Sequence, residues 1–431
     1  MRLYPLNATQ EDMLSETNWE TMENGYVVCA YYELPHKYFT AEKIAAAYQE
    51  VLDKLHYCHA HLVQVEGKWM ISEDTGMPNA VNRYQMTYEE WEARKQEFAK
   101  PFKILEEPGI RVNIIDTAKC IVVCCSHFHL FFDGISIIGI CRALEDVMHG
   151  VPLEDQGDIC AEWNEQEIAS YGSEAYERAK AATLEKFKGL KYTDICRQTD
   201  NPYGRTLYSI YLLDYSRLSH IRLKANALSE KQQEKMMTTI CVAAYALALG
   251  QMAGTTDVCF MTTNHGRLDK RLTPKVFGDF IKSMSLRINT APEQSVAQLL
   301  AQTRTALYGM MRTIGYPWSH MMRDLGIPQE DQTGTEMNVS GSGIYEYIDL
   351  FGVDYPCYRI KSPESASHIF MVVQIREEGL TFNVEGSDAL YTKEQLDQIA
   401  RLSGEYALQL TGDQGAKIGE LIPPYAGLHR R

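Results

Sequence analysis

The stretch "SHFHLFFDGIS", residues 126–136, places two histidines, an aspartate and a glycine in a run that otherwise has the character of a buried strand. The preceding "KCIVVCC" is apolar enough for a central strand of a sheet. The following "ISIIGICRALEDVMHG" has apolar residues near helical spacing and ends at Gly150, a helix stop signal. We therefore expect a strand, a sharp turn at Gly134, and a helix capped by Asp133.

Alternate side chains of a strand share a face, so Cys125, His127 and His129 are expected to point one way. A neutral histidine at a strand end can act as a general base, and the helix start beside it offers backbone N–H groups for an oxyanion. Both features suit acyl transfer. The motif alone also fits a satisfied core histidine followed by an ordinary Asp-Gly turn.

Length and composition limit the class of protein. A chain of 431 residues exceeds what one hydrophobic core usually supports, which predicts two domains. The net charge of -15 disfavours nucleic-acid binding. Eleven cysteines without a CxxC pair suit a reducing cytosol, and no apolar run is long enough for a signal peptide or a membrane span. We expect a cytoplasmic protein with neither membrane nor metal in its function.

Strand and helix patterns alternate on both sides of residue 170. Strands are predicted at 25–34, 206–215 and 257–267, and hairpins around Glu66-Gly67 and Glu378-Gly379. Helices are predicted after Thr40, Thr87 and Thr392, and over 236–252. This mixture predicts an α/β (α+β) fold with two similarly built lobes, over residues 1–170 and 171–431.

The motif at 126–136 resembles the HHxxxDG motif of nonribosomal peptide synthetase condensation domains and the HxxxDG of the wider chloramphenicol acetyltransferase-like superfamily. Further stretches are similar in the same order: "YPLNATQEDML", "FAKPFKILEEPGIRVNII", "TTNHGR", "VFGDFIKSMSLRI" and "GLTFNVEGSDALYTKEQLDQI". The resemblance spans nearly the whole chain. It implies two acetyltransferase-like lobes in a V-shaped pseudo-dimer, with the active site in a channel between them.

The resemblance also implies roles for residues. His129 matches the second motif histidine, the base or amine-positioning group, and Gly134 would bring a backbone N–H to the substrate. Asp133 matches the motif aspartate, which is mainly structural and is expected to pair with Arg287. A buried carboxylate needs such a partner, and a guanidinium can bind it through two hydrogen bonds. Phe128 departs from the motif, because condensation domains usually carry their first histidine there.

Other residues are candidates for the channel or for an oxyanion site. His127 shares the face of His129. The run "MNVSGSG" offers Asn338, Ser340 and Ser342 in a region where the resemblance predicts second-lobe residues that line the channel, and a hydroxyl or amide there could bind the oxyanion. A plain Gly-Ser loop is the alternative for that run. His265, beside Gly266 and Arg267, is expected either to face the channel or to cap a turn.

The leading hypothesis is a free-standing condensation-type acyltransferase that joins a thioester-bound acyl or aminoacyl group to an amine. The donor would be a phosphopantetheine or coenzyme A thioester, and no permanently bound cofactor is expected. The 431 residues show no carrier-protein motif, so a carrier would act in trans. Two alternatives remain open: an O-acyltransferase that forms an ester with an alcohol, and a catalytically idle binding module, against which intact His129, Asp133 and Gly134 argue.

Overall fold

The structure, a computed structural model, describes residues 2–15, 17–217, 229–328, 331–332, 334–340, 347–361, 364–365, 368–376 and 378–421. The chain divides into two units. Unit 1 contains Met1–Tyr171, His265–Lys282 and Gly343–Ser362, and unit 2 contains Gly172–Asn264, Ser283–Ser342 and Pro363–Arg431. One boundary between the units follows Tyr171. The chain also returns twice to unit 1 from the stretch that the sequence assigns to the second lobe.

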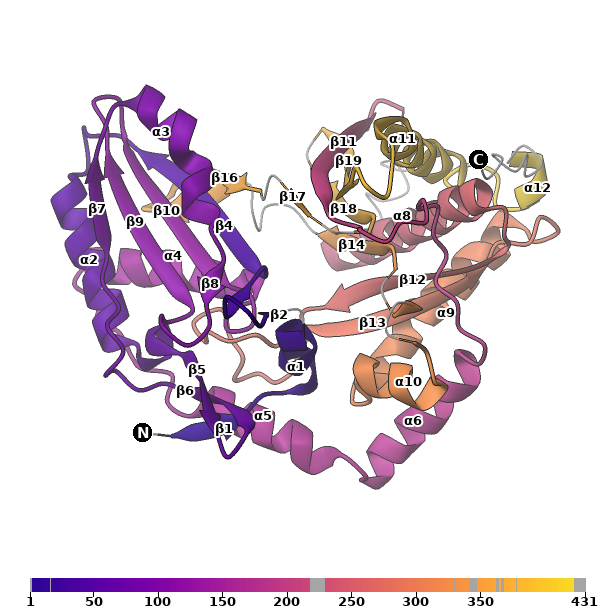
Figure 1. Ribbon diagram of the computed structural model, residues 1–431. Helices are drawn as coiled ribbons and strands as arrows, with labels where there is room; N and C mark the ends of the chain where they lie inside the picture. Colours follow the sequence, from indigo (N-terminus) through magenta and orange to yellow (C-terminus); the bar gives the residue numbers. More distant parts are fainter. Residues whose placement is uncertain are drawn as a thin grey trace. The chain divides into compact units, whose positions relative to one another are not determined.

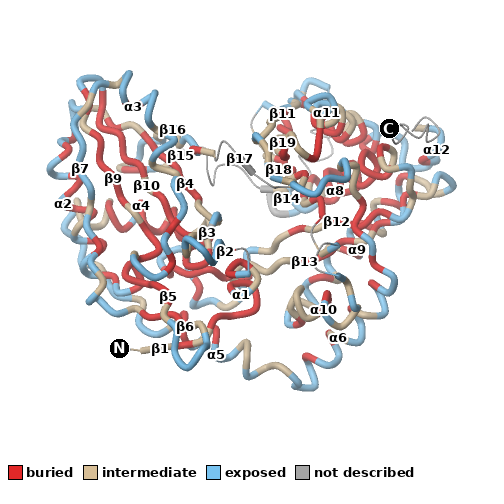
Figure 2. Tube along the Cα trace, in the orientation of Figure 1, coloured by how far each residue is buried: buried red, intermediate tan, exposed pale blue. Residues whose placement is uncertain are grey.

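The main sheet of unit 1 places the histidine motif at its centre. Its strand order among the described residues is β15-β16-β4-β10-β9-β7 (Figure 1). The strands are β4 (Val27–Leu34), β7 (Asn82–Gln85), β9 (Ile110–Asp116), β10 (Ile121–Phe128), β15 (Tyr347–Leu350) and β16 (Val353–Ile360). β10 is antiparallel to β4 and β9, with His127 opposite Val28 and Ile110. Figure 2 shows β10 as almost wholly buried, which is the central position that its apolar sequence predicts.

Helices and short strands surround this sheet. They are β1 (Leu3–Pro5), α1 (Ala8–Ser15), β2 (Thr17–Asn18), β3 (Glu23–Asn24), α2 (Ala41–Lys54), η1 (His56–His59), β5 (His61–Val65), β6 (Lys68–Ser72), α3 (Tyr88–Arg94), η2 (Lys95–Ala99), β8 (Phe102–Lys103), α4 (Gly134–Met148) and α5 (Ile159–Ser170).

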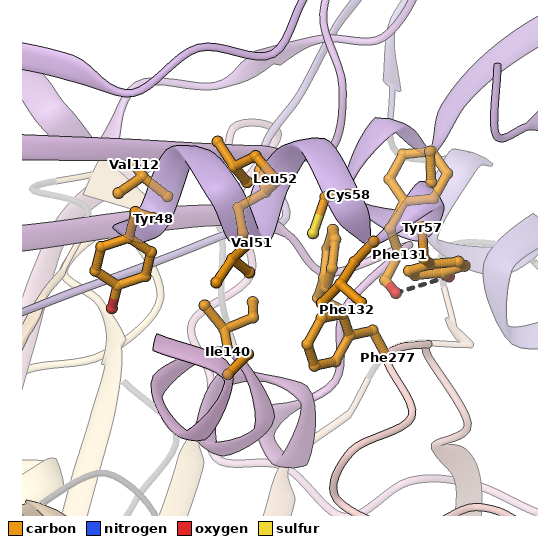
Figure 3. Packing of buried hydrophobic residues seen from close by; sticks show 14 of the residues in the cluster. Tyr48, Val51, Leu52, Tyr57, Cys58, Val112, Phe131, Phe132, Ile140 and Phe277 are labelled. Atoms are coloured by element: carbon orange, nitrogen blue, oxygen red, sulfur yellow. Dashed lines mark hydrogen bonds between the residues drawn. The ribbon is translucent and has the colours of Figure 1, made fainter. Parts of the chain in front are cut away.

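The core of unit 1 joins the sheet to helices α2 and α4. Figure 3 shows Val51 and Leu52 of α2 and Ile140 of α4 in this cluster, together with Val112 of β9. Phe277, from the returning segment 265–282, belongs to the same cluster. Burying such side chains is favourable by about 25 cal/mol per Å² of apolar surface, so this segment is an integral part of unit 1.

Unit 2 has its own sheet and core. Its strand order among the described residues is β13-β12-β14-β18-β19-β11-β17. Its elements are α6 (Glu174–Lys186), β11 (Gly204–Asp214), α8 (Glu230–Ala253), β12 (Asp257–Asn264), β13 (Lys282–Asn289, whose first residue belongs to unit 1), α9 (Val296–Thr313), α10 (Trp318–Leu325), β14 (Glu336–Ser340), β17 (Glu364–Ser365), β18 (Phe370–Ile375), β19 (Gly379–Ser387), α11 (Lys393–Gln409) and α12 (Ile418–Leu421).

Helix α8 is long and apolar enough, over Gln232–Ala253, to meet the composition of a membrane span. However, 78% of its most apolar window is buried inside the protein. Its residues from Ile240 to Leu249 all belong to the hydrophobic core of unit 2. A helix that is apolar on all sides is expected in such a core, so α8 has a structural explanation.

Local signals in the sequence set several element ends. The side chains of Thr40, Thr87 and Thr392 cap α2, α3 and α11, as predicted. Glu66 and Gly67 both have positive φ between β5 and β6, the backbone of a two-residue hairpin turn. These predictions are confirmed because each depends on neighbours in the chain.

Candidate active site

The loop between β10 and α4 is apolar and held at every residue. Leu130, Phe131 and Phe132 are buried. The side-chain amide of Gln10 donates to the Leu130 carbonyl at 2.9 Å, and the Tyr57 hydroxyl donates to the Phe131 carbonyl at 2.9 Å (Figure 3). The backbone N–H groups of Phe131 and Phe132 both donate to the Phe128 carbonyl. These hydrogen bonds fix the positions of His129 before the loop and Asp133 after it.

Asp133 caps α4 and binds an arginine. Its Oδ1 accepts from the Ser136 backbone N–H and hydroxyl, both at 2.9 Å. Arg267 donates to both carboxylate oxygens at 2.8 Å, and its guanidinium also donates to the carbonyls of Thr273 and Val276. The side chains of Arg267 and Asp133 are 3% and 2% exposed. This paired and hydrogen-bonded charge couples the start of α4 to the segment 265–282.

The expected pairing of Asp133 with Arg287 is wrong. Arg287 lies on β13 in unit 2 and donates to both oxygens of Asp257 on β12, at 2.8 and 2.6 Å. Arg267 reaches Asp133 because the chain turns at Gly266, where φ is +63° and a Cβ would lie 1.6 Å from the Phe280 carbonyl oxygen. The glycine in the run His265-Gly266-Arg267 was the sequence signal for this turn, since only glycine fits there. It did not identify the partner of Asp133, because Arg267 and Arg287 each lie at the end of a predicted strand.

His129 lies one residue beyond β10. Its backbone N–H donates to the Tyr26 carbonyl, which prolongs the contact with the chain before β4. The side chain of His129 is 23% exposed. Because Nδ1 is buried, solvent reaches only other atoms of the side chain. Burial lowers the pKa of His129, so the imidazole is neutral near pH 7 and can accept a proton.

Asp279 faces His129 from the segment 265–282. Its Oδ1 lies 3.8 Å from His129 Nδ1, and its side chain is fully buried. Neither carboxylate oxygen has a hydrogen-bond partner among the described residues. Burial, and then the charge of Asp133, raise the pKa of this carboxyl well above its usual value. Sequence reasoning missed Asp279, although a lone acidic residue in the apolar run "VFGDFI" was the available signal.

His127 is buried and lies in apolar surroundings. It lines a narrow cavity between the sheet and α4, together with Cys125 on the same face of β10. Burial lowers its pKa well below the usual value, and Nε2 has no partner among the described residues. The expectation that Cys125 and His127 share a face is confirmed, whereas His129 lies past the end of the strand.

Phe128, at the position of the missing first histidine, is a core residue. Its ring lies 6.0 Å from that of Phe102 and 5.5 Å from that of Phe131, and it is 1% exposed. The sequence difference is therefore accommodated by an aromatic cluster on the face opposite His127 and Cys125.

Replacing Phe128 with histidine is expected to destabilise the protein rather than improve it. An imidazole here would lose the aromatic contacts and bury a polar ring, which costs about 1–3 kcal/mol without a compensating hydrogen bond. Thermal melts of Phe128→His and of the apolar control Phe128→Leu measure this. A Phe128→His variant more stable than Phe128→Leu would contradict the expectation.

The remaining candidates, Asn338, Ser340 and Ser342 of unit 2 and His265 of unit 1, have separate outcomes. Asn338 lies on β14, where Oδ1 accepts from the Thr263 backbone N–H at 2.9 Å and Nδ2 donates to Glu336 at 2.9 Å. Its amide therefore links β14 to β12. Ser340 ends β14, but its side chain, like the whole of Ser342, lies outside the described residues. His265 accepts the Arg267 backbone N–H at 3.0 Å, which is the turn-capping alternative.

A cluster in unit 2 has the donor types of a metal site. Asp194, Cys196 and His368 place ligand atoms within 4.8 Å of one another. The Asp194 oxygens already accept from the Tyr391 hydroxyl, at 2.7 and 2.9 Å, and from the Cys196 backbone N–H at 3.0 Å. Burial raises the pKa of the Cys196 thiol to about 11, which disfavours the thiolate that a metal needs. Hydrogen bonds account for this cluster without an ion.

Solved structures define the class to which this architecture belongs. A double mutant of the starter condensation domain of rhizomide synthetase RzmA, in complex with C8-CoA and Leu-SNAC, is similar with a TM-score of 0.80, 15% identity and 96% of each chain covered. The first condensation domain of the calcium-dependent antibiotic synthetase, with a substrate analogue, has a TM-score of 0.77 at 17% identity over 97% of this chain and 98% of that one. The expected fold of two chloramphenicol acetyltransferase-like lobes is thereby confirmed.

The family follows from the sequence comparison. The model of the condensation domain family matches residues 1–421, so this chain belongs to the condensation domain family, a family of acyltransferases. It is 20% identical over 430 residues to surfactin synthase subunit 1 of Bacillus subtilis (strain 168), covering 97% of this chain and 12% of that protein. It is 27% identical over 244 residues to bacitracin synthase 1 of Bacillus licheniformis, covering 53% of this chain and 4% of that protein. The chain thus corresponds to a small part of these relatives.

Proposed function

We propose that this protein joins a thioester-bound acyl or aminoacyl group to an amine acceptor and so forms an amide. The observation that carries the proposal is the partly exposed His129 at the end of a central strand, next to a hydrogen-bonded loop and the Asp133–Arg267 pair. Such a rigid support suits a base that must be held in one orientation. Burial lowers the pKa of His129, which favours the neutral imidazole.

The proposed reaction needs one base and one thiol leaving group. The acceptor nitrogen attacks the thioester carbonyl, a C–N bond forms, and its proton passes to His129 Nε2. The negative charge on the carbonyl oxygen is stabilised by the Gly134 backbone N–H at the start of α4. The C–S bond then breaks, the thiolate takes the proton from the imidazolium, and an amide and a free thiol leave.

The donor in this proposal is a phosphopantetheine thioester on a carrier protein or the corresponding coenzyme A thioester. The synthases that resemble this chain, and the solved domain in complex with C8-CoA and Leu-SNAC, support that class of donor. Asp133 and Arg267 support His129 without touching the substrate. Ester formation with an alcohol would use the same base and leaving group.

A direct test offers the purified chain octanoyl-CoA with leucyl-SNAC, and in parallel an octanoyl-loaded carrier protein with free amines or alcohols. Released thiol is followed with a chromogenic disulfide, and products are identified by mass spectrometry. The new acyl–nitrogen bond of an amide resists hydroxylamine, whereas esters and thioesters are cleaved, so hydroxylamine is applied to the products of the free amines and alcohols, and the leucyl-SNAC product is identified by mass alone.

The proposal expects a hydroxylamine-resistant product whose formation requires enzyme. A cleavable product formed only with alcohols would instead establish the O-acyltransferase. Binding of donor without any thiol release, across all of these acceptors, would contradict transfer and favour an idle binding module.

A further inference from the structure

Three buried polar atoms at one point of unit 1 have no hydrogen-bond partner in the part of the chain that the structure describes. They are Nδ1 of His129 and both carboxylate oxygens of Asp279. Unpaired buried polar atoms are rare, because each one lowers the stability of the fold. Since Nδ1 and Oδ1 are 3.8 Å apart, a small closure to about 2.9 Å would pair them with each other. Catalytic hydrogen bonds are often long without substrate and tighten when it binds.

We propose that Asp279 is a positioning residue for His129: its carboxylate holds the imidazole through Nδ1–H, leaves Nε2 free, and stabilises the imidazolium formed during transfer. Only the stabilisation of the imidazolium during transfer rests on the proposed function. Asp279 itself touches no reacting atom in this scheme.

The tautomer follows from this pairing. An acceptor at Nδ1 requires a proton on that nitrogen, which leaves the Nε2 lone pair for the acceptor amine. The charge of Asp133 also favours the protonated ring. Asp279 adds a second carboxylate, the one that lies beside Nδ1, because an imidazolium favours the ionised form of a neighbouring carboxyl.

The neighbouring charges do not already supply this role. Asp133 is engaged by Arg267 and the start of α4, and Lys282 is paired with Glu167. His127 is buried with a strongly lowered pKa, so it stays neutral. Among the described residues, the charged or titratable groups that act on the His129–Asp279 pair are Tyr57, His127, Asp133, Arg267, Lys282 and Arg359.

Burying the unpaired carboxyl of Asp279 should lower the stability of the fold. A residue with a structural role would raise stability instead, so the sign of the change separates positioning from a structural role. The raised pKa of Asp279 means that the unfolded chain loses the proton at about 3.8, whereas the folded chain retains it to higher pH while His129 is neutral. Protonation of the imidazole favours the ionised carboxylate, so the charge of Asp279 develops with that of the ring. Stability is therefore lost as the pH rises between these two values. Asp279→Leu and Asp279→Asn should melt at a higher temperature than the wild type at pH 7, and the difference should shrink toward pH 4.

The experiment measures the imidazole directly. The full chain is labelled with ¹⁵N-histidine, and long-range ¹H–¹⁵N spectra of the wild type and Asp279→Asn are followed over pH, with the His129 signals assigned by their loss in His129→Gln. The wild type should show the Nδ1–H tautomer. In Asp279→Asn the ring should titrate about one pH unit or more lower, because a nearby opposite charge is gone. Asp257→Asn, a surface carboxylate in unit 2, controls for net charge.

The same variants are compared in turnover. Asp279→Asn should lower kcat about tenfold, the equivalent of one pKa unit, and move the acid limb of kcat/KM to lower pH. An unmoved titration, or an Nε2–H tautomer in the wild type, would overturn the inference. A shifted titration in a chain that transfers no acyl group would instead count against the proposed function alone, since the spectra need no substrate.

Discussion

Replacing His129 with alanine is expected to lower kcat/KM for acyl transfer by at least about a hundredfold, the usual contribution of a positioned general base. The loss should come from chemistry and not from folding. The backbone around His129 is held by Tyr26, Gln10 and Tyr57 through hydrogen bonds to main-chain atoms, which remain when the ring is removed. Thiol release under saturating donor measures the effect.

The control is His56→Ala, an exposed histidine of the same unit whose side chain is 61% exposed. It should keep wild-type turnover and the wild-type melting temperature. His129→Ala should melt within a few degrees of the wild type. Turnover of His129→Ala close to that of His56→Ala would disprove the assigned base.

Replacing Arg267 with alanine is expected to cost about 3–5 kcal/mol in the free energy of unfolding, because it leaves the buried Asp133 carboxylate unpaired. Activity should fall with stability, since the start of α4 and Gly134 depend on this pair. Denaturant titration followed by circular dichroism, with turnover measured on the same samples, tests both effects. The free energy of unfolding of Arg267→Lys should lie between those of the wild type and Arg267→Ala, because lysine keeps the charge and loses the two parallel hydrogen bonds.

Arg287→Ala is the matched control. It removes the same side chain from an ion pair whose partners are 28% and 55% exposed, so the expected cost is about 0.2–1 kcal/mol. Equal losses in the Arg267→Ala and Arg287→Ala variants would mean that burial does not distinguish these pairs. A stable Arg267→Ala variant without activity would place Arg267 in the chemistry and contradict its role as a brace.

Much of the local structure could be predicted from sequence. The end of β10, the cap formed by Asp133, and the caps at Thr40, Thr87 and Thr392 all depend on residues within a few positions of one another. Apolar periodicity was enough to place β10 inside a sheet. For the same reason His127 and Cys125 could be assigned to one face.

The partners of the motif could not be predicted in this way. Asp133 and Arg267 are 134 positions apart, and Arg287, on β13 in unit 2, fits a sequence-level argument equally well. A single carboxylate in an apolar run was the only indication in the sequence that Asp279 has a function. Its position opposite His129 could not be predicted, because it depends on the return of residues 265–282 to unit 1.

The sequence by itself determined that a histidine follows a central strand and that an aspartate caps the next helix, because hydrogen bonds and apolar spacing between near neighbours decide both. Only the tertiary structure decided that Arg267 balances Asp133 and that Asp279 faces Nδ1 of His129. Charges are paired by distance in space, and the turn at Gly266 and the packing of Phe277 into unit 1 set those distances.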